Sequence, residues 1–173
     1  ICQAIGTNWI KDTALLENLK PFADDASFRE QFAKVKYNNK VRLAKFLKAH
    51  QGTDVDPTFI FDAQSKRLHE YKRQMLNALH ILVLYNRIVD DPSFTMAPRT
   101  FFFGAKAAPG YYMAKLIIKL INNISNVINA DPQTNKKLKM YFIPNYRVSL
   151  AEKIIPAADL SGIKPFQGSS FKS

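Results

Sequence analysis

Residues 58–64 of this chain read TFIFDAQ, and after one serine they are followed by KRLHEYKRQ, residues 66–74. The first segment is short, apolar and rich in β-branched and aromatic side chains, which predicts a buried strand. The second packs four cations, one histidine and one carboxylate into nine residues. Open α/β sheets bind ligands at the carboxyl ends of their strands, and Arg and Lys together suit a phosphate group. This junction therefore predicts an anion site.

The basic segment has one alternative interpretation, a solvated first helical turn in which Glu70 pairs with Lys66 or Arg73. Cations at the start of a helix oppose its macrodipole, which costs free energy when no anion is present to justify them. We therefore favour the anion site.

A helix is predicted on each side of this strand. Residues 27–30, SFRE, resemble a capping box, and apolar residues recur at helical spacing until Gly52, which is predicted to end the first helix. The second helix is predicted to end near Val89. Its predicted apolar face consists of Leu68, Tyr71, Met75, Leu79, Leu82 and Val83.

Two further strand–helix units follow. A strand is predicted for residues 99–104, then a helix opened by Pro109 with a wide apolar stripe from Met113 to Ile128. A third strand is predicted for residues 138–143, before a helix that carries Leu150, Ile154 and Ile155. Strands that alternate with helices at this spacing pair in parallel through right-handed crossovers. The predicted fold is α/β, a Rossmann-like parallel sheet with flanking helices.

Composition limits the class of protein. The 173 residues fit one domain, and an apolar content of 47% excludes a disordered chain. No apolar run is long enough to cross a bilayer, and the first residues do not form a secretory signal, so we expect no membrane partner. The single cysteine fits a reducing compartment, and we expect a cytoplasmic protein. A net charge of +11 favours anionic ligands, but no nucleic-acid-binding signature accompanies it, so we expect no nucleic acid partner.

The remaining chemistry-bearing residues do not form a known motif. One cysteine and three scattered histidines lack the spacing of a zinc site, so no metal is predicted. No catalytic triad and no phosphate-binding glycine loop stands out. We interpret His50 as a cap near a helix end and His80 as a core or boundary residue, and we leave His69 without a role.

Three segments resemble one family. Residues 66–77, KRLHEYKRQMLN, closely resemble a signature of the α-glucan phosphorylases, which act on glycogen, starch or maltodextrin. Residues 106–111, KAAPGY, and residues 145–161, NYRVSLAEKIIPAADLS, resemble the same family in the same order. Three long, ordered motifs are a stronger signal than a lone glycine fingerprint. The resemblance covers about residues 26–161.

This resemblance implies a fold and an activity. Phosphorylases have a two-domain glycosyltransferase-B type fold, and the chain matches the first part of the C-terminal domain, so we expect it to supply at most one half of an active site. The family releases glucose 1-phosphate from α-1,4-glucan non-reducing ends, with inorganic phosphate as co-substrate. Its cofactor, pyridoxal phosphate, acts through its own phosphate group. The Schiff-base lysine and the partner domain do not appear here, so we expect the isolated chain to bind no cofactor and to be inactive. We also expect the isolated chain to be monomeric and the parent to be a homodimer.

The resemblance also assigns residues. Arg67 and Lys72 are expected to contact the substrate phosphate. This requires Arg67 to lie in the strand-to-helix turn and Lys72 one turn into the helix. The surroundings of the cofactor phosphate are expected to include Lys66, Tyr146 and Arg147. The loop near the active-site entrance is expected to bind substrate through Lys106, Ala108, Gly110 and Tyr111.

The chain departs from the family pattern in two places and in its tail. Ala105 stands where a second glycine is usual, and Tyr112 where histidine is usual. For Tyr111 and Tyr112, ordinary boundary packing and a binding role remain equal alternatives. We expect three parts: a helical segment, residues 1–56; the βα units, residues 57–161; and a flexible tail outside the family pattern, residues 162–173. The competing function is a non-enzymatic, basic anion-binding module.

Overall fold

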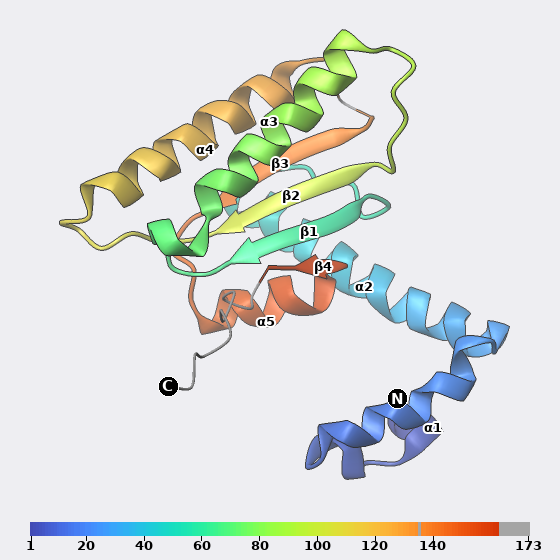
Figure 1. Ribbon diagram of the computed structural model, residues 1–173. Coiled ribbons are helices and arrows are strands. Elements are labelled where there is room, and N and C mark those ends of the chain that lie inside the picture. Colours follow the sequence, from blue (N-terminus) through green and yellow to red (C-terminus); the bar gives the residue numbers. More distant parts are fainter. Residues whose placement is uncertain (135, 163–173) are drawn as a thin grey trace, which may run out of the picture. The chain divides into compact units, whose positions relative to one another are not determined.

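The computed structural model describes residues 1–134 and 136–162 (Figure 1). It divides the chain into two compact units, Ile1–Asn38 and Asn39–Ser173. Of the predicted tail, only Gly162 lies within the described residues. No helix among the described residues combines the length and the apolar character needed to cross a membrane.

The first unit is helical. It contains the short helix α1 (Cys2–Ile5), the 3₁₀-helices η1 (Asn8–Ile10) and η2 (Thr13–Ala23), and the start of α2 (Ala26–Gln51). The predicted capping box at residues 27–30 is wrong. Asp25 caps α2 instead, because its Oδ1 accepts hydrogen bonds from the backbone nitrogens of Ser27 (2.9 Å) and Phe28 (3.2 Å).

The second unit is built on a parallel sheet of four strands in the order β3-β2-β1-β4 (Figure 1). The strands are β1 (Ile60–Ser65), β2 (Arg99–Gly104), β3 (Leu138–Ile143) and β4 (Leu160–Ser161). Every pairing is parallel, so the predicted α/β fold is confirmed. The two-residue β4 was not predicted as a strand, because it is too short to show a periodic pattern.

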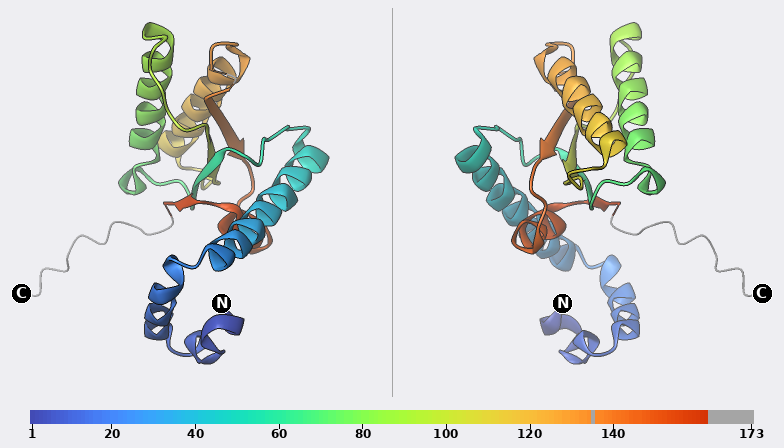
Figure 2. Two further views of the ribbon diagram at one scale, coloured as in Figure 1. Left: turned by 90° about the vertical axis from the view of Figure 1, so that its right-hand side faces the viewer. Right: turned by 90° about the vertical axis from the view of Figure 1, so that its left-hand side faces the viewer.

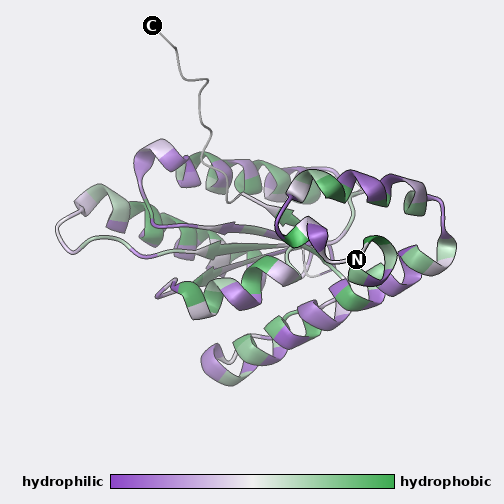
Figure 3. Cartoon of the chain, turned by 90° about the horizontal axis from the view of Figure 1, so that it is seen from below, coloured by the Kyte–Doolittle hydropathy of each residue, from purple (hydrophilic) through white to green (hydrophobic). Residues whose placement is uncertain are grey.

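Helices cover both faces of this sheet (Figure 2). The helices α3 (Gln74–Asp90) and α4 (Tyr112–Ala130) lie side by side over one face, where Ile81 and Ile121 pack on Phe101, Phe103 and Met140. The end of α2 and the helix α5 (Val148–Ala157) cover the other face. In Figure 3 the strands are mostly coloured as hydrophobic, whereas the helices that cover them carry both hydrophobic and hydrophilic residues. Burial on two faces explains why buried residues follow one another along β2 and do not alternate with exposed ones.

The helix after β1 differs from the prediction. It begins at Gln74, after a 3₁₀-helix η3 (Glu70–Lys72), and the residue between them, Arg73, has a left-handed backbone (φ 58°). Leu68 is buried, but in the loop that precedes the helix. The predicted apolar face is wrong, since Met75, Leu79 and Val83 are exposed. The buried positions are Gln74, Ala78, Ile81 and Ile88.

The other helix boundaries agree with the predictions except at one place. Gly52 follows α2 with φ 66°, a conformation that glycine adopts without strain. By contrast, α4 begins at Tyr112, so Pro109 lies in the loop before the helix and not in its first turn. The predicted stripe from Met113 to Ile128 is partly buried: Ile117, Ile121 and Ile124 are in the core, whereas Met113, Leu116 and Val127 are exposed.

The strand order reverses beside β1, because β2 and β3 lie on one side of it and β4 lies on the other. From β1 the chain proceeds to β2 and β3 with both crossover helices on one face, and α5 then returns across the opposite face so that β4 pairs with the free side of β1. The carboxyl ends of β1 and β4 therefore form a topological switch point, where open α/β sheets bind ligands.

Candidate anion-binding site

Three loops leave the carboxyl edge of the sheet side by side. The backbone nitrogen of Lys66 donates to the Gly104 carbonyl (2.9 Å), and that of Leu68 donates to the Lys106 carbonyl (3.2 Å). The nitrogen of Ala105 in turn donates to the Ile143 carbonyl (3.2 Å). The ladder of the sheet thus continues past the strands, and it aligns the basic segment with the loop that follows β2.

Amide side chains hold the basic segment in place. The Gln74 side chain donates to the carbonyl of Arg67 (3.2 Å), and the Gln64 side chain donates to the carbonyl of Lys72 (3.3 Å). Asn77 donates to the Gln64 side-chain oxygen (3.0 Å) and fixes its orientation. Sequence reasoning missed these residues. The available signal was Gln64, a polar residue inside the strand that was predicted to be buried, whereas nothing in the sequence marked Gln74 as buried.

Arg67 and Lys106 line one pocket of about 370 Å³. Its wall also includes His69 and the small residues Ala107 and Ala108. Among the predicted residues, the structure therefore brings Arg67, Lys106 and Ala108 together. Lys72, Gly110 and Tyr111 are not part of this lining. Two cations beside an open pocket that is partly lined by small residues are suited to binding an oxyanion.

Lys66 and Lys72 form a second basic pair. Partial burial of Lys66 lowers the pKa of its ammonium group, and the positive charge of Lys72 lowers it further. Two like charges at one strand end are unfavourable until an anion neutralises them. Lys72 lies in η3, not one turn into a continuous α-helix as expected, so that geometric expectation is wrong.

Tyr111 connects the second loop to the basic segment. Its hydroxyl donates to a carboxylate oxygen of Glu70 (2.6 Å) and accepts from the Glu70 backbone nitrogen (3.4 Å). The hydrogen bond to Glu70 is the main reason why the pKa of Tyr111 is raised. The His69 ring lies between two tyrosines, with centroids 5.2 Å from Tyr71 and 5.8 Å from Tyr111. Tyr111 therefore holds Glu70 in position. Glu70 is the residue that the alternative interpretation paired with Lys66 or Arg73.

The ends of β1 and β2 approach each other closely below the basic segment. A Cβ atom added to Gly104 would lie 2.9 Å from Ser65 Oγ and 3.2 Å from the Tyr146 ring. Ser65 Oγ and Gln74 Oε1 are buried polar atoms without a hydrogen-bond partner among the described residues. The Tyr146 ring therefore lies near the ends of β1 and β2, and two polar atoms without a partner among the described residues lie at the same edge.

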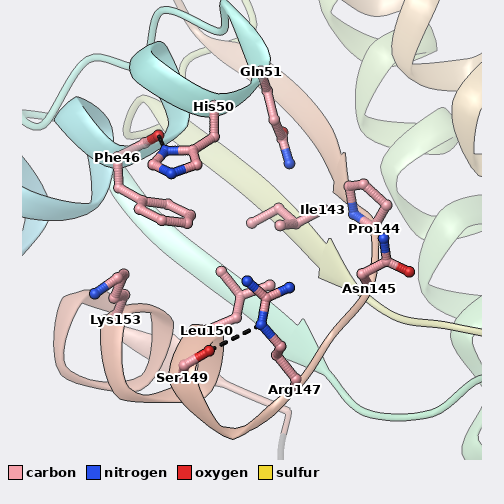
Figure 4. A pocket seen from close by; sticks show the side chains of 10 residues that line it. All are labelled: Phe46, His50, Gln51, Ile143, Pro144, Asn145, Arg147, Ser149, Leu150 and Lys153. Carbon is pink, nitrogen blue, oxygen red and sulfur yellow. Dashed lines mark hydrogen bonds between the residues drawn. The ribbon is translucent and has the colours of Figure 1, made fainter.

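Arg147 lies apart from this cluster. Its guanidinium lines a different pocket, between the end of α2 and the start of α5 (Figure 4), and that pocket shares no residue with the one around Arg67. Asn145, which begins the turn into α5, has a left-handed backbone (φ 55°). Strained non-glycine residues often occur at functional sites. Near the end of α2, His50 Nδ1 lies 2.9 Å from the carbonyl of Phe46, whereas His80 is exposed.

No group of three potential metal ligands occurs within residues 1–134 and 136–162.

Comparison with known proteins gives the relatives of this chain. The sequence model of the family described as "Carbohydrate phosphorylase" matches residues 1–167. The chain is 50% identical over 161 residues to the liver form of glycogen phosphorylase from Homo sapiens, and 51% identical over 161 residues to the muscle form from Mus musculus. It is 51% identical over 157 residues to a glycogen phosphorylase from Haemophilus influenzae.

These matches cover 91–93% of this chain but 19% of each relative, so the chain spans about one fifth of their length. The family match extends over both structural units and contains all of the residues discussed above. The chain belongs to the carbohydrate phosphorylase family.

Proposed function

We propose that this chain is part of an α-glucan phosphorylase, which uses inorganic phosphate to release glucose 1-phosphate from the non-reducing ends of α-1,4-glucans. The single observation that carries this proposal is the cluster of basic residues at the topological switch point of the sheet, with Lys66 half-buried beside Lys72. The relatives that the chain matches at about 50% identity are named glycogen phosphorylases, which supports the same reaction.

In this proposal the basic residues divide between two phosphate groups. Arg67 and Lys72 bind the substrate phosphate, and Arg67 shares its pocket with Lys106. Lys66, Tyr146 and Arg147 belong to the surroundings of the cofactor phosphate. Two dianions held close together repel each other strongly, so several fixed cations in a site that excludes water are needed to hold both. The loop with Ala108, Gly110 and Tyr111 then borders the glucan entrance.

The residues present fit the phosphate end of pyridoxal phosphate. Lys66 supplies a cation, and the buried hydroxyl of Ser65 next to it lacks a hydrogen-bond partner in the described part of the chain. The chemistry that this cofactor supplies in the family is a proton relay through its phosphate group. The role of this chain is to hold that phosphate and to keep the neighbouring cations at fixed positions.

The test uses the full-length protein that contains this chain. With maltodextrin and inorganic phosphate it should release glucose 1-phosphate, and Arg67→Ala should lower kcat/KM by about 100-fold or more, as removal of one fixed charge from a transition-state site does. Arg87→Ala, on the exposed surface of α3, is the matched control and should retain activity. Unchanged phosphorolysis in Arg67→Ala would remove this residue from the mechanism.

The alternative function, a basic module without enzymatic activity, is favoured by the net charge of +11. It predicts heparin binding that falls steeply with salt and no release of glucose 1-phosphate. We also propose that the parent protein is a cytoplasmic homodimer and that the isolated chain is a monomer. Sedimentation of both forms tests the two oligomeric states, and fractionation of cells that produce the parent tests the compartment.

A further inference from the structure

Two buried glutamines contact the backbone of the basic segment. Gln64 is 9% exposed and Gln74 is 1% exposed. A buried amide costs free energy unless its polar atoms have hydrogen-bond partners. The Nε2 atoms of these two side chains have partners, which are the carbonyls of Lys72 and Arg67. These are the two residues for which we proposed contact with the substrate phosphate.

The contact at Lys72 lies where the chain departs from regular helix. In a continuous α-helix the Lys72 carbonyl would accept from the backbone nitrogen four residues later. Here Arg73, with its left-handed backbone (φ 58°), separates η3 from α3. A non-glycine residue in this conformation is strained and persists only where its surroundings hold it. The Gln64 side chain supplies such a contact, because it donates to the Lys72 carbonyl at 3.3 Å, directly before the strained residue.

Asn77 determines which end of the Gln64 amide faces Lys72. The Nδ2 atom of Asn77 donates to Gln64 Oε1 at 3.0 Å, so the oxygen of this amide is already engaged and its nitrogen faces the Lys72 carbonyl. An amide turned the other way would bring two acceptors together. The backbone nitrogen of Asn77 also donates to the Arg73 carbonyl at 3.2 Å. One side chain of β1 and one of α3 therefore hold the end of η3 between them.

These amide contacts keep two like charges near each other. Burial of Lys66, and then the positive charge of Lys72, lower the pKa of Lys66. Two ammonium groups that repel each other move apart unless the backbone prevents it. The hydrogen bond from Gln64 to the Lys72 carbonyl opposes that movement.

From these contacts we infer that Gln64, oriented by Asn77, is a positioning residue for the binding of inorganic phosphate. Gln64 acts through the backbone of Lys72, and the place of the Lys72 ammonium group follows from that backbone. Since Lys72 is taken as a phosphate ligand, this inference rests on the proposed function. Position matters because a contact misplaced by about 1 Å can lower a rate by roughly 100-fold.

The test uses the full-length enzyme that contains this chain, with initial rates measured against inorganic phosphate and against maltodextrin. Gln64→Met keeps the length of the side chain and removes both polar atoms. It should raise KM for inorganic phosphate about tenfold, near the upper range for one hydrogen bond, and leave KM for maltodextrin unchanged. A substitution that only destabilises the fold lowers the amount of active enzyme, and so lowers kcat without a change in either KM.

Asn77→Ala should raise KM for inorganic phosphate several-fold. The double variant should be no worse than Gln64→Met alone, because Asn77 acts through Gln64. Asn77 is only half-buried, so Asn77→Ala provides the same test where Gln64→Met fails to fold. The matched controls are Gln31→Met on α2 and Asn122→Ala on α4, two exposed amides with local hydrogen bonds, and both KM values should stay unchanged in them.

The outcomes separate this inference from the proposed function. An unchanged KM for inorganic phosphate in Gln64→Met and Asn77→Ala, in an enzyme that releases glucose 1-phosphate, would overturn the inference and leave the function standing. Fully additive effects of the two substitutions would also overturn it, because Asn77 would then act without Gln64. No release of glucose 1-phosphate by the unmodified enzyme would overturn both.

Discussion

The hydroxyl of Tyr111 donates a 2.6 Å hydrogen bond to the carboxylate of Glu70, 41 residues earlier in the chain. This contact joins the loop after β2 to the basic segment after β1. The two loops also share the backbone bond from Leu68 to Lys106. The position of the cations in the pocket around Arg67 therefore depends on contacts made by Glu70 and Tyr111, which do not line that pocket.

Tyr111→Phe removes this hydrogen bond and is expected to loosen the basic segment. Backbone amides of Glu70 to Lys72 should exchange hydrogen several-fold faster, with little change in the rest of the sheet. Tyr112→Phe, at a side chain that is 72% exposed, is the matched control and should leave these rates unchanged. Because the pKa of Tyr111 is raised in the folded chain, its stabilising effect is complete at neutral pH and is lost as pH rises through that pKa.

Lys72→Met is expected to raise the pKa of Lys66 toward its ordinary value, since it removes a neighbouring positive charge. A lysine whose pKa is lowered on folding holds fewer protons in the folded chain. Stability of the unmodified chain should therefore rise with pH through the lowered pKa of Lys66, and this dependence should shrink in the variant. Acetylation rates of Lys66 against pH provide the measurement. Lys115→Met, on an exposed part of α4, should not alter them.

Lys40→Met should destabilise the second unit by about 2 kcal/mol, between the values for exposed and buried ion pairs. Lys40 Nζ lies 2.5 Å from Asp159 Oδ2, and its side chain is only 12% exposed. The same carboxylate accepts the backbone nitrogen of Phe61, so this pair holds α2 and the residue before β4 to β1. Urea denaturation measures the loss.

The exposed pair of Lys48 and Asp54 provides the control for that experiment. Lys48→Met should cost less than about 0.5 kcal/mol, because water screens this pair. The double variant with Lys40→Met and Asp159→Asn should recover part of the loss, since it no longer leaves a carboxylate without its cation. Equal losses in Lys40→Met and Lys48→Met would refute the role of the Lys40–Asp159 pair.

Gly104→Ala should destabilise the chain by about 1–3 kcal/mol through overpacking. The added Cβ would lie 2.9 Å from Ser65 Oγ and 3.2 Å from the Tyr146 ring. Ser65→Ala, which removes that hydroxyl, should reduce the cost in the double variant. A Cβ on Gly110 meets no atom within 4 Å, so Gly110→Ala should have little effect in the same thermal unfolding experiment.

The local order of strands and helices was visible in the sequence. The apolar run of β2, Phe101 to Phe103, is continuous because both faces of this strand are buried, and the spacing between the strands leaves room for one helix each. The run of cations after β1 was equally visible, because the carboxyl end of a parallel strand is where side chains can face a ligand.

The sequence alone determined the family, the α/β fold and the basic segment, because each depends on neighbouring residues or on a local period. Only the tertiary structure decided where α3 begins. The side chain of Gln64 donates to the carbonyl of Lys72, and that of Gln74 donates to the carbonyl of Arg67. These contacts stabilise η3 as a separate turn before α3. The tertiary structure also decided which cations meet. Lys66 neighbours Lys72, whereas Arg147 points into the pocket beside α5, because the path of each loop is set by contacts between residues far apart in the chain.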